Sequence, residues 1–94
     1  MTALKNALAK VDRLERAIRP YVGYALEVSQ ILNSLAQLKN LIQEPSSKNI
    51  DLALEMIKDS EQIFQPYRSM PQVAPLLNTL NGLTEDLKEA RKQF

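Results

Sequence analysis

Apolar residues recur at alternating steps of three and four along the first 42 residues of the chain. This spacing places them on one face of an α-helix, in the a and d positions of a heptad repeat. The series keeps its phase across Pro20 and Gly23, and Lys39 is its single polar interruption. Its members are Leu4, Ala7, Val11, Leu14, Ile18, Tyr21, Ala25, Val28, Leu32, Leu35 and Ile42.

Pro20 allows two interpretations of this series. A proline inside a helix removes one hydrogen bond and pushes against the carbonyl four residues earlier, at a cost of about 3 kcal/mol. Because the apolar series stays in phase, it favours one long helix over residues 2–43, kinked at Pro20. The alternative is a four-helix bundle with a break at Pro20, although Arg19-Pro20 leaves almost no loop for an antiparallel turn. In that alternative the helices span about 2–18, 21–43, 49–65 and 72–92.

Two later segments interrupt the helical pattern. "QEPSSKN" at 43–49 supplies turn and capping residues ahead of the next helix. "QPYRSMP" at 65–71 is bounded by two prolines, and the Ser69-x-x-Gln72 spacing that overlaps its end has the form of a capping box for a last helix. Gly82 weakens that helix by about 1 kcal/mol relative to alanine and marks a close contact between helices. We therefore predict an all-α fold in which a long N-terminal helix packs with two shorter ones.

Composition supports a single helical domain over residues 1–94, which we interpret as a piece of a larger protein. Apolar residues make up 45% of the chain and aromatic residues only 5%, so aliphatic side chains must build the core. Two glycines are too few for a turn-rich β-sandwich or β-barrel. Helix packing is the architecture that this set of residues favours.

The sequence contains few of the side chains that catalysis and metal binding commonly use. The chain contains no histidine and no cysteine, which removes the commonest general base and the thiol nucleophile. Asp51, Glu55 and Asp59 step by four along one helix face, as expected for a solvated surface. We expect no enzyme activity, no cofactor and no metal. No apolar run approaches the length that crosses a bilayer, and we expect a cytoplasmic protein.

The apolar face of the first half of the long helix is the predicted partner site. The two shorter helices can cover residues 21–43, which leaves the earlier segment without a neighbour. An uncovered apolar stripe of this kind indicates a docking surface for a partner helix. The alternative is a second copy of the same chain, giving a self-associating structural bundle. The predicted partner-binding residues are Leu4, Leu8, Val11, Leu14 and Ile18.

Charge adds a second candidate surface on the same helix. The net charge is only +1, but residues 1–20 carry five cations against two anions. Lys10, Arg13, Arg16 and Arg19 are spaced three apart and suggest a basic contact face. Peripheral binding to a membrane through this face is a further alternative function. The excess is too small for the basic stripe typical of nucleic-acid binders.

The run "AKVDRLERAIRPYVGYALEVSQILNSLAQLKNLI" and the helical segment that follows it resemble a known family. They are similar to the N-terminal rod of an exocyst tethering subunit, the one that also contacts the plasma membrane. The resemblance covers residues 9–94 and is carried by Ile18-Arg19-Pro20 and by Ser69-Met70-Pro71. It implies a role in vesicle tethering during exocytosis, with the N-terminal coiled coil pairing with another subunit of the tethering complex.

Overall fold

The structure is a computed structural model that describes residues 2–94, and these residues form a bundle of four α-helices with no strand. The prediction of an all-α fold is therefore confirmed. Two short 3₁₀ helices, η1 (Arg19–Tyr21) and η2 (Gln65–Tyr67), follow the first and third helices. The α-helices are α1 (Thr2–Ile18), α2 (Leu26–Gln43), α3 (Ser47–Phe64) and α4 (Ala74–Arg91).

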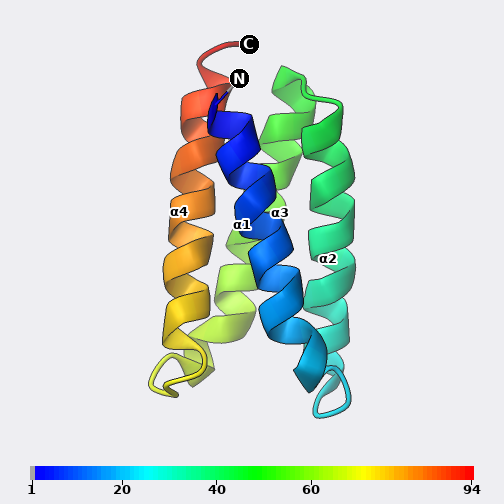
Figure 1. Cartoon of the computed structure of the whole chain (residues 1–94), viewed down its shortest axis with the longest axis vertical. Coiled ribbons are helices and arrows are strands. Elements are labelled where there is room, and N and C mark those ends of the chain that lie inside the picture. Colours follow the sequence, from blue (N-terminus) through cyan, green and yellow to red (C-terminus); the bar gives the residue numbers. More distant parts are fainter. Residues whose placement is uncertain (1) are drawn as a thin grey trace.

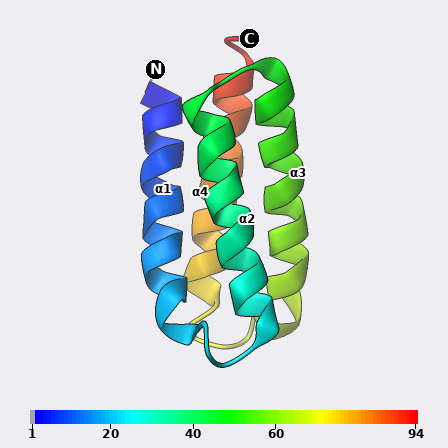
Figure 2. The ribbon, with the colours of Figure 1, turned by 90° about the vertical axis from the view of Figure 1, so that its right-hand side faces the viewer.

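The helices run up and down as two antiparallel hairpins, α1–α2 and α3–α4 (Figures 1 and 2). Each helix packs against two neighbours, so that α1 lies between α2 and α4, and α3 lies between the same two helices. The bundle measures 38 × 21 × 19 Å. The connections within the two hairpins lie at one end, which we call the loop end, and both chain termini lie at the other (Figure 1).

The prediction of one long helix through Pro20 is wrong, and the alternative with a break at Pro20 describes the structure. α1 ends at Ile18, and the chain reverses through η1 before α2 begins at Leu26. Pro20 has no N–H to donate to the carbonyl of Arg16, so the α-helical hydrogen-bond ladder stops there. The chain tightens into 3₁₀ geometry, and the N–H of Val22 donates to the carbonyl of Arg19 at 3.2 Å.

The apparent continuity of the apolar series depended on residues that are not in the core. Tyr21 is exposed, as is Ala25, which lies in extended backbone just before α2. The buried face of α2 consists of Ile31, Leu35, Leu38 and Ile42. Only Leu35 and Ile42 of these four belong to the apolar series that was predicted to continue from α1. The series therefore kept its phase across the proline by coincidence.

The second hairpin repeats the first. Ile18-Arg19-Pro20-Tyr21 recurs as Phe64-Gln65-Pro66-Tyr67, and each proline stands second in its 3₁₀ helix. Both turns continue with the same 3.0 Å hydrogen bond, from Tyr24 N–H to the Tyr21 carbonyl and from Met70 N–H to the Tyr67 carbonyl. Gly23 has no positive φ, and Ser69 takes the equivalent place in the second turn. Proline, rather than glycine, is therefore the residue that these turns require.

The core follows the same repeat. The four buried residues of α1 recur 46 positions later in α3, and three buried residues of α2 recur 45 positions later in α4. The step falls by one because Leu35 follows Ile18 by 17 positions, whereas Leu80 follows Phe64 by 16. The matched pairs are Ala7 and Ala53, Val11 and Ile57, Leu14 and Ser60, Ile18 and Phe64, Leu35 and Leu80, Leu38 and Leu83, and Ile42 and Leu87.

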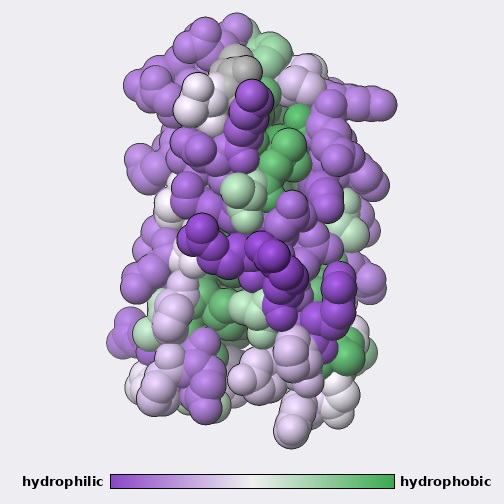
Figure 3. All heavy atoms as spheres, viewed as in Figure 1, coloured by the Kyte–Doolittle hydropathy of each residue, from purple (hydrophilic) through white to green (hydrophobic). Residues whose placement is uncertain are grey.

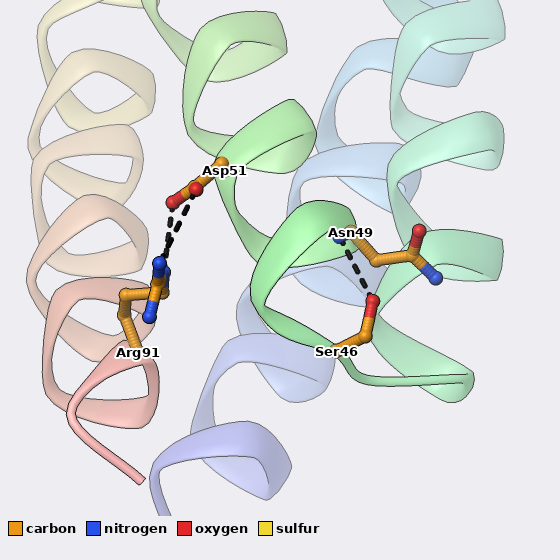
Figure 4. A network of polar contacts seen from close by, with 4 residues as sticks. All are labelled: Ser46, Asn49, Asp51 and Arg91. Carbon is orange, nitrogen blue, oxygen red and sulfur yellow. Dashed lines mark hydrogen bonds and ion pairs between the residues drawn. The ribbon is translucent and has the colours of Figure 1, made fainter. Parts of the chain in front are cut away.

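Polar contacts fix the end of the bundle that carries the termini (Figure 4). The hydroxyl of Ser46 accepts a hydrogen bond of 3.1 Å from the N–H of Asn49, which caps α3 as the sequence predicted. Arg91 Nε lies 2.9 Å from Asp51 Oδ1 and joins α4 to the N-terminal half of α3. The predicted capping box at Ser69 is wrong, because α4 begins at Ala74 with no side-chain cap.

The close helix contact predicted at Gly82 lies between α4 and α1. A Cβ placed on Gly82 would be 2.9 Å from Cε of Lys10, whose ammonium pairs with Asp86 one turn further along α4. Glycine therefore leaves room for the lysine side chain to cross α4 on the way to its carboxylate.

Leu14→Ala tests whether the first helix belongs to the core. Leu14 is 1% exposed, so we expect the substitution to lower the free energy of unfolding by about 2–4 kcal/mol. Urea denaturation followed by circular dichroism measures the change. The control is Leu52→Ala, at a leucine that is 45% exposed, which should change stability by less than about 1 kcal/mol. Equal effects at the two positions would contradict the burial of α1.

Gly82→Ala tests the crossing of Lys10 over α4. Alanine favours the helix by about 1 kcal/mol, but its Cβ must displace the lysine side chain. We expect a smaller gain in stability in the natural chain than in a Lys10→Ala background, where the full propensity gain should appear. A double-mutant cycle of unfolding free energies measures this coupling. The same gain in both backgrounds would show that the lysine is not confined.

Candidate interaction site

An apolar groove opens at the loop end, between the two hairpins. Its volume is about 680 Å³, and all four helices and both connections contribute to it. Figure 3 shows apolar surface in hollows between the helices on one side of the molecule. We call the groove of about 680 Å³ the loop-end groove. Its lining residues are Ala17, Ile18, Tyr21, Tyr24, Ala25, Glu27, Val28, Ile31, Ile63, Phe64, Tyr67, Met70, Gln72, Val73, Pro75 and Leu76.

The groove exists because the core is less completely covered at this end. Leu83, in the body of the bundle, is 0% exposed, whereas Phe64 beside the groove is 8% exposed. Val73, which directly precedes α4, and Leu76 on α4 pack against the core but are only half-buried. The groove therefore gives access to core side chains from the end of the bundle.

Exposed apolar side chains gather around the groove. Of eight large hydrophobic residues that are exposed among residues 2–94, six lie at the loop end. Tyr24 is the most exposed at 82%, and its ring centroid lies 5.9 Å from that of Tyr21. Tyrosine rings combine large contact area with low entropy cost, which suits them to interfaces. The six residues are Tyr21, Val22, Tyr24, Leu26, Tyr67 and Met70.

The groove walls repeat each other, as the hairpins do. Ile18 on one wall corresponds to Phe64 on the other, and Val28 corresponds to Val73. The polar positions break the match, because Glu27 on α2 corresponds to Gln72 on the other wall. The groove thus has two similar apolar halves and an uneven charge.

The residues predicted to bind a partner are instead part of the core or pack against it. Val11, Leu14 and Ile18 are at most 3% exposed, and Leu4 and Leu8 are half-buried against the core. The chain's own α2 and α4 cover them, because the reversal at Pro20 brings α2 back alongside α1. The prediction of an uncovered stripe on α1 is therefore wrong. Ile18 alone reaches the loop-end groove.

The predicted basic face does not form a single surface. Residues three apart are turned by about 300°, so the row rotates by roughly 60° at each step. Lys10 pairs with Asp86 on α4, whereas Arg16 and Arg19 line a polar hollow toward α2. Arg13 is exposed on the helix between them.

The polar hollow lies between α1 and α2 and has a volume of about 320 Å³. Its residues are Asp12, Glu15, Arg16, Arg19 and Lys39. Lys39, the polar interruption of the apolar series, crosses to α1, where its Nζ lies 2.9 Å from Asp12 Oδ1. This hydrogen bond, with the negative charges of Asp12 and Glu15, raises the pKa of Lys39 above its ordinary value.

Sequence inspection missed the loop-end groove, although a signal for it was present. The segment apolar-x-Pro-Tyr occurs twice, at Ile18 and at Phe64, and each copy ends a helix. Two such endings 46 positions apart indicate hairpins whose turns lie at the same end. The tyrosines that follow the two prolines then meet around one opening.

Residues 2–94 show neither a cluster of metal ligands nor a membrane-spanning helix. In the part of the chain from Thr2 to Phe94, no group of three acidic side chains is placed to hold a metal ion. None of the helices within that part combines the length and hydrophobicity needed to cross a bilayer. The loop-end groove is therefore the candidate functional site.

Comparison with known proteins returns no matching family, no similar curated protein and no similar solved structure.

The Lys39–Asp12 pair makes a testable prediction about pH. A raised pKa in the folded state contributes stability below the ordinary lysine pKa of about 10.4, and this contribution is lost as the pH rises through the folded value. We expect Asp12→Asn to lower the pKa of Lys39, measured by NMR titration of its Cε. The difference in unfolding free energy between the natural chain and Asp12→Asn should shrink at high pH. An unchanged lysine pKa would contradict the pairing.

Proposed function

We propose that this chain is a non-catalytic helical interaction module that binds a partner helix in the loop-end groove. The observation that carries the proposal is the gathering of exposed apolar side chains around an opening of about 680 Å³ that reaches the core. Exposed apolar surface gathered in this way is typical of binding sites. An amphipathic helix laid into an apolar groove is a recurring form of recognition.

The partner surface differs from the stripe expected on α1, but the kind of interaction is the same. A helix brings apolar side chains at i, i+4 and i+7 to one face, and these can enter a groove between other helices. Tyr21 and Tyr24 on one wall, and Tyr67 and Met70 on the other, provide the rim. The floor is formed by Ile18 and Phe64, which belong to the core.

The resemblance to the exocyst rod supports a place in vesicle tethering at the cytoplasmic side of a membrane. The long N-terminal helix that formed part of this resemblance is absent, because α1 ends at Ile18. The proline-containing segments Ile18-Arg19-Pro20 and Ser69-Met70-Pro71 remain as its support, and both lie at the loop end. The partner in this setting is another subunit of the tethering complex.

Photo-crosslinking through the groove rim tests the proposal. A benzoylphenylalanine in place of Tyr24 should form an adduct with one defined protein in cell extract, because this side chain is 82% exposed at the rim. The control position is Leu52, which is 45% exposed outside the groove. Mass spectrometry identifies the adduct, and a tethering-complex subunit would support the trafficking role.

The affinity of the identified partner for variants of the chain is then the decisive measurement. Tyr24→Ser should weaken binding by about 2 kcal/mol, or roughly thirtyfold, if this tyrosine anchors the interface. Its thermal unfolding should not change, since the side chain is largely in solvent. Leu52→Ser should bind as the natural chain does. Adducts that form equally at both positions, or only with a second copy of the chain, would overturn the proposal.

A further inference from the structure

We infer that this chain associates with a second copy of itself by exchanging hairpins. In the resulting dimer, the first hairpin (α1–α2) of each copy packs against the second hairpin (α3–α4) of the other. The exchange does not depend on what the loop-end groove binds, and it therefore goes beyond the proposed function. Three features of the structure support it, namely the internal repeat, the short link between the hairpins and one ion pair that joins them.

Each hairpin buries its apolar face against a hairpin of the same build. The agreement extends beyond the matched core residues, since Ile31-Leu32-Asn33-Ser34-Leu35 in α2 recurs as Leu76-Leu77-Asn78-Thr79-Leu80 in α4. The hairpins meet in two places, where α1 packs against α4 and where α2 packs against α3. Neither of these contacts requires the two hairpins to belong to the same copy of the chain.

The link between the hairpins is short and is closed by little of its own chemistry. It consists of Glu44, Pro45 and Ser46, at the end of the bundle that carries the termini (Figure 2). Among the side-chain hydrogen bonds of residues 2–94, the one that closes it joins Asn49 Nδ2 to the Glu44 carbonyl at 2.7 Å and is exposed. Proline favours an extended backbone at the residue before it. A short connection of this kind between packed elements favours exchange between copies.

One ion pair joins the two hairpins and indicates which of them pair. Lys10 on α1 contacts Asp86 on α4, and their side chains are only 26% and 19% exposed. Within residues 2–94, every other ion pair lies inside a single hairpin. A largely buried charge that loses its partner is strongly destabilising. The first hairpin therefore requires a neighbour with a carboxylate at this place.

The repeat has apolar residues at the matching contact between α3 and α2. The counterparts of Lys10 and Asp86 there are Met56 and Leu41, which both pack against the core. Two first hairpins packed together would place Lys10 against Leu41, and two second hairpins would place Met56 against Asp86. Each arrangement leaves a half-buried charge without a counter-ion, which disfavours it. Association between copies is therefore directed to unlike hairpins.

The core and the lysine crossing select the same arrangement. Leu14 and Ser60 are matched in the repeat, and both are buried. Like hairpins would bring two leucines or two serines to that level of the core, which overfills it or leaves a cavity. Gly82, over which Lys10 passes, is matched by Gln37 in α2, so two first hairpins would also obstruct the lysine.

Exchange through this link determines the shape of the dimer. Three extended residues span about 10 Å, which is enough to join two bundles whose terminus-bearing ends face each other. Each bundle is 38 Å long, so the dimer is a rod of about twice that length. Its two loop-end grooves lie at opposite ends of the rod.

Two charge-exchange variants test the inference when they are mixed. Lys10→Asp and Asp86→Lys each place like charges between α1 and α4, which should destabilise either variant alone. In the mixture, exchange restores opposite charges in both bundles, because one bundle combines the two substituted positions and the other combines natural Lys10 with natural Asp86. The variants are unfolded together and refolded at about 1 mM, where a second copy competes with a short tether. We expect sedimentation velocity to show mostly dimer, with a melting temperature about 5 °C above that of either variant.

The ion pair inside the first hairpin provides a matched control. Asp12→Lys and Lys39→Asp also place like charges between neighbouring helices, here α1 and α2. Exchange keeps these two helices on the same copy, so mixing cannot restore opposite charges. The control mixture should therefore melt as its separate variants do. Circular dichroism extends the test to a variant that does not fold alone, since the Lys10→Asp and Asp86→Lys mixture should then gain helicity.

The possible outcomes decide for or against the exchange. A mixture of Lys10→Asp and Asp86→Lys that stays monomeric and melts as the separate variants do would overturn it. So would equal dimer formation by either variant alone, because like hairpins would then be pairing. A gain in the control mixture would show association without exchange and would also contradict it. Helix binding by the loop-end groove is unaffected by these results, because the monomer already forms the groove.

Discussion

The absence of a backbone N–H at Pro20 and at Pro66 is the constraint on which the rest of the structure depends. Each proline ends an α-helix, tightens the chain into a 3₁₀ turn and allows a reversal within a few residues. Two reversals with the same geometry produce two hairpins of similar length. The bundle, the covering of α1 and the opening at the loop end all follow from where these two helices stop.

The same constraint decides which apolar surface is left for other molecules. A continuous first helix would have extended its apolar stripe beyond the shorter helices. With the reversal at Pro20, that stripe is instead covered by α2 and α4, and Leu14 is only 1% exposed. The exposed apolar residues are consequently at the end of the bundle, where the turns leave the core partly open.

The sequence predicted the helical class and much of the local chemistry but not the path of the chain. A heptad pattern shows which face of a helix is buried, yet the same face serves a coiled coil and a closed bundle. Ser46, which caps α3, and Gly82, which faces Lys10, were recognisable because their effects are local. The reversal at Pro20 was not, because a proline can kink a helix or end it, and the packing of distant segments decides between them.

The groove could have been anticipated only by comparing two distant segments. Neither Tyr21 nor Tyr67 indicates a site by itself, since tyrosines often lie at the edge of a core. Their common position after a proline that ends a helix is what relates them. The charged row from Lys10 to Arg19 was misjudged for a different reason, since a step of three rotates gradually around a helix and does not stay on one side.

The matched cores of the two hairpins make the molecule equivalent to a dimer of hairpins whose subunits are covalently joined. The link is the short segment between α2 and α3, and it keeps the second hairpin at an effective concentration in the millimolar range for the first. Cleavage of this segment would leave two fragments that each expose one apolar face and are complementary in shape. The bundle therefore belongs to the folds suited to reconstitution from separate halves.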